Sequence, residues 1–192
     1  ALIYITWRVA FTIPDAPVAG IIAGVVLVTA EIVGLVQLLM ATVIGWQDYR
    51  PDVVTFDPRQ GIPTVDIFIA TYSEPTTVLE PTLAGAMGIR YPGPVTVYLC
   101  DDGSRAEMRE LAERYGAVYL EREDHSHAKA GNLNNALAHS TGELVVTLDA
   151  DMIPTAEFLE KTVGYFTDER VWFVQAPHAF HNEHAFQHDL FA

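Results

Sequence analysis

Cysteine and basic residues are scarce in this sequence. Cys100 is the only cysteine among 192 residues, which excludes a disulfide within the chain and suits a reducing compartment. Only 11 lysines and arginines stand against 25 aspartates and glutamates, so the formal net charge is −14. A chain this acidic is a poor partner for nucleic acid, and its soluble part is a poor partner for an anionic membrane surface. A phosphorylated substrate would need a cation and locally placed donors.

Two glycine-rich nucleotide-binding motifs are also missing. No Gly-x-Gly-x-x-Gly fingerprint follows the first predicted strand, and no phosphate-binding loop with Gly-Lys-Ser occurs. A dehydrogenase with a Rossmann dinucleotide site and a P-loop enzyme are therefore disfavoured.

Long apolar runs, by contrast, dominate the first fifty residues. Between Val18 and Trp46 only Glu31 and Gln37 are strongly polar. A helix of that length extends about 43 Å, enough to cross a hydrocarbon core of about 30 Å with tilt. No basic segment precedes the run and no cleavage site closes it, so a signal peptide is not indicated.

A second apolar run precedes this helix, from residue 1 to residue 13, and a proline-rich turn joins the two. We expect residues 1–48 to form a transmembrane helical hairpin whose first helix is partial. Arg50 and Arg59 follow the hairpin, which predicts that everything after residue 50 lies on the cytoplasmic side of a multi-pass membrane protein. Residues 49–63 are rich in proline, aspartate and glycine and are predicted to be a linker.

From residue 64 to residue 192, strand and helix patterns alternate. The predicted strands cover residues 65–71, 95–100, 118–120, 144–148 and 171–175, and the predicted helices cover residues 77–87, 106–115, 130–139 and 155–165. This alternation predicts parallel βαβ units, and therefore an α/β fold with a mostly parallel sheet flanked by helices.

Polar side chains gather where three of these strands end. They are Tyr72 and Glu74 after the first strand, Asp101 and Asp102 after the second, and Asp149 and Asp151 after the fourth. Any one set is equally typical of a turn, but the carboxyl ends of parallel strands line one crevice. Asp149 and Asp151 would repel each other without a cation, and Mg²⁺ or Mn²⁺ accepts such ligands together with phosphate oxygens.

Lys129 is one of only two lysines, and it falls at a predicted helix N-terminus. A lysine there opposes the helix dipole, so reaching for a phosphate explains it better. A solvated surface lysine is the alternative.

Five motifs in this order resemble those of processive family 2 glycosyltransferases, and most of all those of the bacterial cellulose synthase type. They are Tyr72-Ser73-Glu74-Pro75, Cys100-Asp101-Asp102-Gly103, His127-Ala128-Lys129-Ala130-Gly131-Asn132, Asp149-Ala150-Asp151 and Val174-Gln175-Ala176-Pro177-His178. The membrane segment is similar too, at Trp7-Arg8, Ile13-Pro14 and Glu31. The resemblance covers nearly the whole chain.

The resemblance implies a GT-A fold and an inverting, metal-dependent transfer of glucose from UDP-glucose, with Mg²⁺ or Mn²⁺, to a growing, membrane-translocated β-glucan. It implies a bacterial-type plasma (inner) membrane, with lipid, the acceptor glucan and accessory subunits as partners. By the same resemblance, the residues that contact uridine would be Tyr72, Glu74, Asp101 and Asp102. Lys129 would bind the diphosphate, Asp149 would contact the ribose, the diphosphate or the metal, and Asp151 would be the principal metal ligand. The residues near the acceptor would be Gln175, His178 and Asn182.

Some positions depart from the cellulose synthase pattern. Ser73, Met152, Ala176 and His181 replace the residues usual in that family, so a curdlan-type or mixed-linkage β-glucan synthase is the alternative product assignment. The family's Thr-Glu-Asp motif, which supplies the general base, and its Gln-x-x-Arg-Trp motif do not occur in these residues. We therefore expect this chain to carry the donor-binding half and to be inactive alone. A non-catalytic membrane sensor that binds a UDP-sugar is the alternative from a different class.

Overall fold

The computed structural model describes residues 2–12, 17–46, 52–55 and 61–179. The chain divides into two compact units, residues 1–52 and residues 53–192. This division falls within the predicted linker at residues 49–63, whereas the predicted domain boundaries at residues 48 and 63 stay predictions.

The first unit is helical. It contains the short helix α1 (Leu2–Trp7), a π-helical turn (Arg8–Thr12) and the long helix α2 (Val18–Gly45). α2 is long and apolar enough to cross a membrane, judged by its length and composition. The helix predicted for this stretch is confirmed, and it ends one residue before Trp46.

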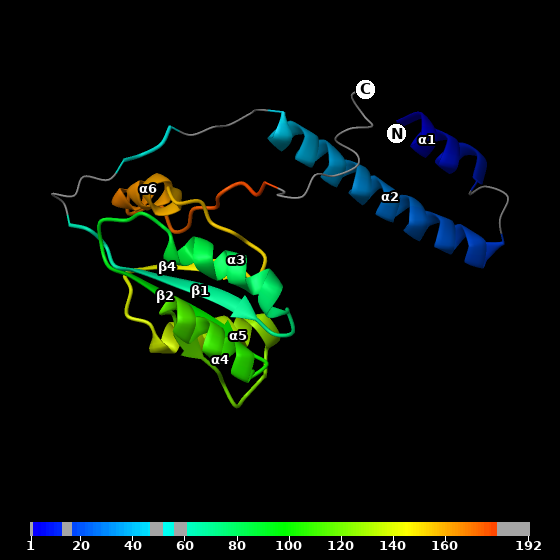
Figure 1. Ribbon diagram of the computed structural model, residues 1–192. Coiled ribbons are helices and arrows are strands. Elements are labelled where there is room, and N and C mark those ends of the chain that lie inside the picture. The colour runs from blue at the N-terminus through cyan, green and yellow to red at the C-terminus, as the bar shows by residue number, and fades with distance from the viewer. Residues whose placement is uncertain (1, 13–16, 47–51, 56–60, 180–192) are drawn as a thin grey trace, which may run out of the picture. The chain divides into compact units, whose positions relative to one another are not determined.

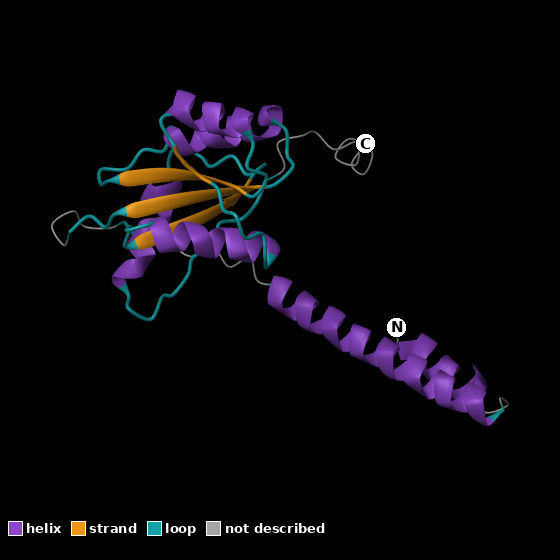
Figure 2. Cartoon of the chain, turned by 90° about the horizontal axis from the view of Figure 1, so that it is seen from below, coloured by secondary structure: helices purple, strands orange, loops and turns teal. Residues whose placement is uncertain are grey.

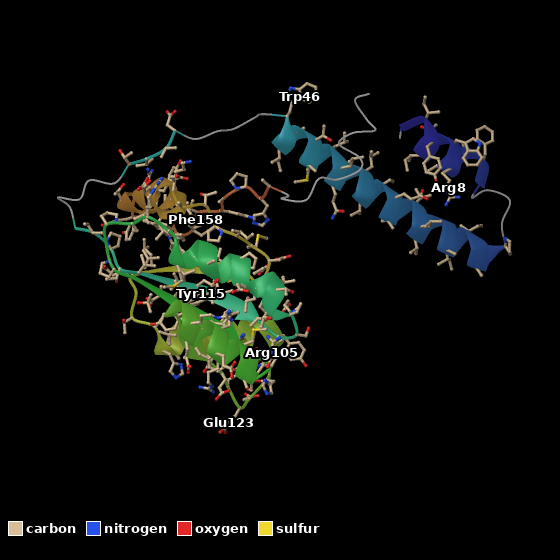
Figure 3. All side chains as sticks on the ribbon, viewed as in Figure 1. Arg8, Trp46, Arg105, Tyr115, Glu123 and Phe158 are labelled. Atoms are coloured by element: carbon tan, nitrogen blue, oxygen red, sulfur yellow. The ribbon has the colours of Figure 1, made fainter. Side chains whose placement is uncertain are left out.

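Glu31 on α2 is met by polar groups of the preceding helical segment. The Tyr4 hydroxyl donates to Glu31 Oε1 at 3.1 Å, and Arg8 Nε lies 3.5 Å from Glu31 Oε2. Figure 3 shows Arg8 beside α2. Arg8, which interrupts the first apolar run, therefore neutralises Glu31, which lies within the second. This pairing lowers the free-energy cost of placing either charge in apolar surroundings.

The second unit is built on a four-stranded parallel sheet (Figure 1). Its strands are β1 (Val65–Thr71), β2 (Val95–Asp101), β3 (Val118–Leu120) and β4 (Leu144–Asp149), arranged in the order β3-β2-β1-β4. The strands β2 and β3 are thus added on one side of β1, and β4 is added on its other side. Parallel folds with such a switch in strand order bind ligands at the carboxyl ends of the strands on either side of it. The predicted parallel α/β fold is confirmed.

Helices cover both faces of this sheet (Figure 2). They are α3 (Thr76–Met87), α4 (Ala106–Tyr115), α5 (Ala128–His139), α6 (Phe158–Thr162) and a 3-10 turn (Val163–Thr167). Ile67 and Ile69 of β1 pack in the larger core with α3 and α4, whereas Phe68 packs in the smaller core with α5. Because successive strand residues point to opposite faces and both faces are covered, β1 is buried along its whole length, as its apolar sequence predicts.

Three predicted elements differ from the structure by more than one residue. The helix expected over residues 155–165 is the shorter α6 followed by the 3-10 turn, and α5 begins at Ala128 rather than Ala130. The strand expected over residues 171–175 is wrong: these residues form no ladder with a described strand, and Trp172 and Phe173 are exposed. A β-rich composition alone does not make a strand, because a strand also needs a partner for its backbone groups.

Candidate active site at the strand ends

The carboxyl ends of β1, β2 and β4 lie side by side at one edge of the sheet. The ladders pair Thr71 with Asp101 and Ala70 with Asp149, so the last residues of the three strands are neighbours. The residues that follow them carry the predicted uridine and metal ligands, and the structure therefore brings these segments to one edge, as predicted from the sequence. Arg105, which follows β2, lies at this end of the sheet in Figure 3.

Glu74 folds back onto the end of β1. Its Oε2 accepts hydrogen bonds from the Tyr72 amide at 2.8 Å, the Thr71 hydroxyl at 2.8 Å and the Ser73 amide at 3.2 Å. These donors, the Tyr72 amide first, lower the pKa of Glu74 to about 2 against the opposing effect of burial. An ionised Glu74 thus fixes the turn that presents Tyr72, whose side chain is exposed.

Asp101 is fully buried and organises the end of β2. Its Oδ1 accepts from Arg105 Nε at 3.1 Å and Arg105 Nη2 at 2.8 Å, and its Oδ2 accepts from the Arg105 amide at 2.7 Å and the Tyr119 hydroxyl at 3.1 Å. Burial, followed by the charge of Asp101, raises the pKa of Tyr119, which keeps that hydroxyl a donor. A direct contact between Asp101 and uridine, as the resemblance implies, would require these bonds to open.

Arg105 also ties the ends of the two strands together. Its Nη1 donates to the Glu74 carbonyl at 2.6 Å and its Nη2 to the Thr71 hydroxyl at 2.9 Å. Gly103 lies against this junction, where a Cβ atom would stand 2.6 Å from the Tyr72 carbonyl oxygen. Only glycine allows so close an approach of the two loops.

An open pocket of about 650 Å³ lies between these loops. Its walls come from the residues after β1 and β2, from the first turn of α4 and from the loop before α5: Tyr72, Ser73, Pro75, Asp102, Gly103, Arg105, Glu107 and His125. Two of the predicted uridine-binding residues, Tyr72 and Asp102, therefore line one pocket.

Asp102 is a buried residue in the lining of this pocket and is held by Arg122. The carboxylate accepts from Arg122 Nε at 2.6 Å and from Nη2 at 2.8 Å, a bidentate pair, and His125 Nδ1 lies 3.0 Å from Oδ1. Arg122, followed by the smaller contribution of His125, lowers the pKa of Asp102 although burial opposes this. Because an ionised carboxylate only accepts, this contact places the His125 proton on Nδ1.

Arg122 extends the same network to the start of α5. Its Nη1 donates to the Ser126 carbonyl at 2.8 Å and its Nη2 to the Ala128 carbonyl at 2.9 Å. The backbone between them is strained, since His127 and Ala128 have φ values of 63° and 46°. One buried arginine thus holds an unusual turn that begins the helix carrying Lys129.

Lys129 lies in the first turn of α5 and pairs with Asp149 at the end of β4. The Lys129 side chain is 54 % exposed and that of Asp149 is 49 % exposed. Asp151, two residues further on, is exposed in the turn that follows β4. The predicted diphosphate ligand and one of the two predicted metal ligands are therefore brought together from segments 20 residues apart.

The residues present fit a divalent cation that is shared with a substrate. Asp149 and Asp151 supply hard carboxylate oxygens at the same strand end, and within the part of the chain that the structure describes Asp151 forms no ion pair. Among those described residues no group of three or more histidine, cysteine, aspartate or glutamate side chains is positioned to enclose a metal. Two carboxylates suit Mg²⁺ or Mn²⁺, which takes its remaining ligands from phosphate oxygens and water.

Two of the three predicted acceptor-side residues lie within the described part of the chain. Gln175 and His178 are exposed and belong to no helix or strand, and Asn182 lies outside the described residues. Their proximity to an acceptor stays a prediction.

Sequence reasoning missed Arg105, Arg122 and His125, which hold or line the pocket. The sequence does contain an indication of the two arginines, although local patterns of helix and strand do not reveal it. In a chain with only 11 lysines and arginines, Arg105 lies four residues after Asp101 at the end of β2, and Arg122 lies two residues after the end of β3.

Comparison with known proteins agrees with this geometry. The model of the family "Glycosyl transferase family 2" matches residues 66–190. The chain is 40 % identical over 195 residues to the cellulose synthase 1 catalytic subunit (UDP-forming) of Komagataeibacter xylinus, and 36 % identical over 190 residues to the cellulose synthase catalytic subunit (UDP-forming) of Xanthomonas axonopodis pv. citri. These alignments cover 99 % and 97 % of this chain but 26 % of each relative.

Solved structures show the same fold. A mannosyltransferase from Pyrobaculum calidifontis, in complex with GDP-Man and Mn²⁺, matches 74 % of this chain and 43 % of its own with 29 % identity and a TM-score of 0.58. Glucosyl-3-phosphoglycerate synthase from Mycobacterium tuberculosis, at 21 % identity, matches 64 % of this chain and 47 % of its own with a TM-score of 0.50. With a family model that covers most of its length and a GT-A-like parallel sheet, this chain belongs to glycosyl transferase family 2.

Proposed function

We propose that this chain carries the donor-binding part of a UDP-glucose-dependent β-glucan synthase of the cellulose synthase type. The reaction is a metal-dependent transfer of glucose with inversion at the anomeric carbon. The observation that carries the proposal is the placement of Lys129, Asp149 and the exposed Asp151 at the strand end next to the pocket that Tyr72 and Asp102 line. The resemblance to UDP-forming cellulose synthase subunits supports the choice of nucleotide and sugar.

In this proposal the pocket receives the uridine. The exposed ring of Tyr72 offers a stacking surface, and Asp102 and His125, of which Asp102 is held by Arg122, offer polar groups in the lining. Arg122 neutralises Asp102, so the pocket does not repel an anionic nucleotide as strongly as the net charge of the chain suggests.

Lys129 binds the diphosphate. Since Lys129 and Asp149 are each about half exposed, their pair stabilises the protein by at most about 1 kcal/mol and opens at little cost. A diphosphate can then replace Asp149 as the partner of Lys129, and the first amides of α5 add further donors.

Asp151 and Asp149 hold the Mg²⁺ or Mn²⁺ ion. A bound divalent cation neutralises the charge that develops on the leaving diphosphate. Asp151 is the principal ligand, because Asp149 also has Lys129 as a partner. Gln175, His178 and Asn182 approach the acceptor glucan.

The first unit anchors the enzyme in a bacterial-type inner membrane. α2 supplies one candidate span, and the multi-pass arrangement, the cytoplasmic side of the second unit, the contact with lipid and any accessory subunits belong to this proposal. Residues 1–48 act as the membrane hairpin and residues 64–192 as the glycosyltransferase part.

The test measures UDP binding to detergent-solubilised protein with Mn²⁺ and with EDTA. Asp151→Asn should weaken UDP binding about tenfold or more in Mn²⁺ and change it little in EDTA, since loss even of a group that only orients a metal ligand typically costs about 10–100-fold in metal affinity. Asp168→Asn is the matched control, because Asp168 is bonded to its own neighbour Arg170. Equal losses in both buffers would refute the metal assignment, and binding of GDP as tight as that of UDP would refute the nucleotide.

The alignment with the Komagataeibacter xylinus relative covers 26 % of that protein's length. The transfer is therefore tested with the full-length enzyme. With UDP-glucose, the full-length protein should form an insoluble glucan, and Asp151→Asn should abolish it. Intact UDP binding without any glucan formation would instead favour the alternative function, a non-catalytic membrane sensor that binds a UDP-sugar.

A further inference from the structure

Thr82 on α3 makes a contact that sets it apart from other helical threonines of this chain. Thr29, Thr42 and Thr162 each donate their hydroxyl to the carbonyl four residues earlier in their own helix, at 2.8 Å. Thr82 instead donates across the core to the carbonyl of Ala150, 68 residues away, also at 2.8 Å. It is completely buried.

The acceptor of this bond is the central residue of Asp149-Ala150-Asp151. The ladder between β1 and β4 ends at Asp149, so the Ala150 carbonyl lies beyond the last rung of the sheet. Ala150 is only 5 % exposed, and its carbonyl would therefore be buried without a ladder partner. The hydroxyl of Thr82 satisfies it and fixes the plane of the peptide that joins Ala150 to Asp151.

The surrounding packing holds this peptide against α3. Gly85 lies one turn after Thr82, and a Cβ atom there would stand 3.0 Å from Ile153 Cγ2 and 3.2 Å from Pro154 Cδ. The Met152 amide donates to the Asp149 carbonyl at 3.1 Å, which closes a tight turn around Ala150 and Asp151. α3 thus forms the floor beneath the turn that carries both carboxylates.

We propose that Thr82 is a positioning residue, which sets the orientation of Asp151 through the Ala150 carbonyl. This inference rests on the proposed function, because the consequence for a substrate follows only if Asp151 binds a metal. Groups that orient metal ligands typically cost about 10–100-fold in metal affinity when they are removed. Because Thr82 is completely buried, it would not contact the metal or the nucleotide directly. It would act on Asp151 through its hydrogen bond to the Ala150 carbonyl.

The experiment compares Thr82→Val, which keeps the shape but removes the donor, with Thr82→Ser, which keeps the donor. The apparent Mn²⁺ affinity of the detergent-solubilised chain is measured by electron paramagnetic resonance at saturating UDP. Thr82→Val should lose about tenfold or more in Mn²⁺ affinity. Thr82→Ser should restore most of it, and neither should alter uridine affinity in EDTA. Leu111→Ala, in the same core but on α4, controls for a general loss of stability.

A second measurement needs neither metal nor nucleotide. The amide of Asp151 follows the Ala150 carbonyl, so its ¹⁵N and ¹H chemical shifts should change in Thr82→Val and stay near the wild-type values in Thr82→Ser and Leu111→Ala. If the valine variant does not fold, Thr82→Ala takes its place in both measurements.

The outcomes separate the two proposals. A shift of the Asp151 amide together with a selective loss of Mn²⁺ affinity supports the positioning role. An unmoved amide, or equal losses of Mn²⁺ and uridine affinity in Thr82→Val and Leu111→Ala, overturns it. A wild-type protein that binds UDP without any need for metal overturns the proposed metal site, while the amide shifts still decide whether Thr82 orients Asp151.

Discussion

Lys129 pairs with Asp149 and so joins the first turn of α5 to the end of β4. In a chain with a net charge of −14, this lysine is the cation nearest in sequence to the strained turn at His127 and Ala128. The pair is exposed enough to open, which makes Lys129 available to an anionic ligand.

Replacing Lys129 should affect the diphosphate and spare the nucleoside. Lys129→Ala is expected to lower UDP affinity about tenfold or more, because a hydrogen bond to a charged group contributes about 1.5–3 kcal/mol. Uridine affinity should change far less. Calorimetric titration of both ligands checks this, with Lys161→Ala, the only other lysine in the sequence, as the control. Equal losses for UDP and uridine would identify a structural lysine instead.

Arg122 should not tolerate lysine. Its planar guanidinium makes two bonds to Asp102 and two to backbone carbonyls at the start of α5, and an ammonium group cannot reproduce that fork. Arg122→Lys is expected to lower the Tm and to weaken the binding of both UDP and uridine, because it loosens Asp102 in the pocket lining and the turn before Lys129 together. Arg170→Lys, at an exposed pair, is the control and should leave both unchanged. Wild-type binding by Arg122→Lys would contradict the bidentate role.

Glu74 should stabilise the second unit in a defined pH range. Its pKa is lowered from 4.5 to about 2, chiefly by the Tyr72 amide, so its ionised form is favoured by folding. The stabilisation is complete above about pH 4.5 and is lost as the pH falls from there towards about 2. Glu74→Gln should therefore lower the Tm at neutral pH, and its difference from wild type should vanish near pH 2.

Thermal unfolding of both proteins between about pH 2 and 7 measures this difference. Glu113→Gln, at an exposed position on α4, is the control and should differ little from wild type across the range. A Glu74→Gln difference that is constant with pH would show that the ionisation of Glu74 does not stabilise the fold.

Glu31 and Arg8 should be energetically coupled. Each single substitution removes the Arg8–Glu31 ion pair, so Glu31→Gln and Arg8→Gln should each destabilise the helical unit. The double variant should be destabilised by less than the sum of the two. A double-mutant cycle on thermal unfolding in detergent gives the coupling, and strictly additive effects would refute it. Gln37→Leu, elsewhere on α2, serves as the control.

Cys100 should be inert in the folded protein. Burial raises the pKa of its thiol to about 12, so about one molecule in 10⁴ carries a thiolate near pH 8. A thiol reagent such as DTNB should react with one group per chain in denaturant and with almost none in native protein. Rapid stoichiometric labelling of the native protein would contradict the burial of β2.

Local patterns in the sequence predict the elements of the second unit well. β1, α4 and β3 have the predicted bounds, because alternating apolar runs and turn residues are properties of neighbouring positions. The meeting of three strand ends follows from parallel pairing, so the approach of Asp101 and Asp149 to one edge is also predictable.

Contacts between distant segments are not predictable in this way. Nothing near Thr82 in the sequence indicates that its hydroxyl reaches Ala150, and nothing near Arg122 indicates that it grips Asp102. The early start of α5 depends on positive φ values at His127 and Ala128, which these residues adopt only because tertiary contacts hold them. The prediction of a strand at residues 171–175 is wrong for the same reason, because strand pairing depends on two segments and a local pattern describes only one.

The position of β4 in the sheet has a consequence for handling the protein. β4 pairs with β1 on one side, and among the described residues no strand lies along its other side. Its sequence, Leu-Val-Val-Thr-Leu-Asp, holds one charge, at the last residue. Such an unpaired row of amides and carbonyls can pair with strands of other molecules. Preparations of these 192 residues should therefore become turbid with time unless a lysine replaces Val145, a residue that is 39 % exposed.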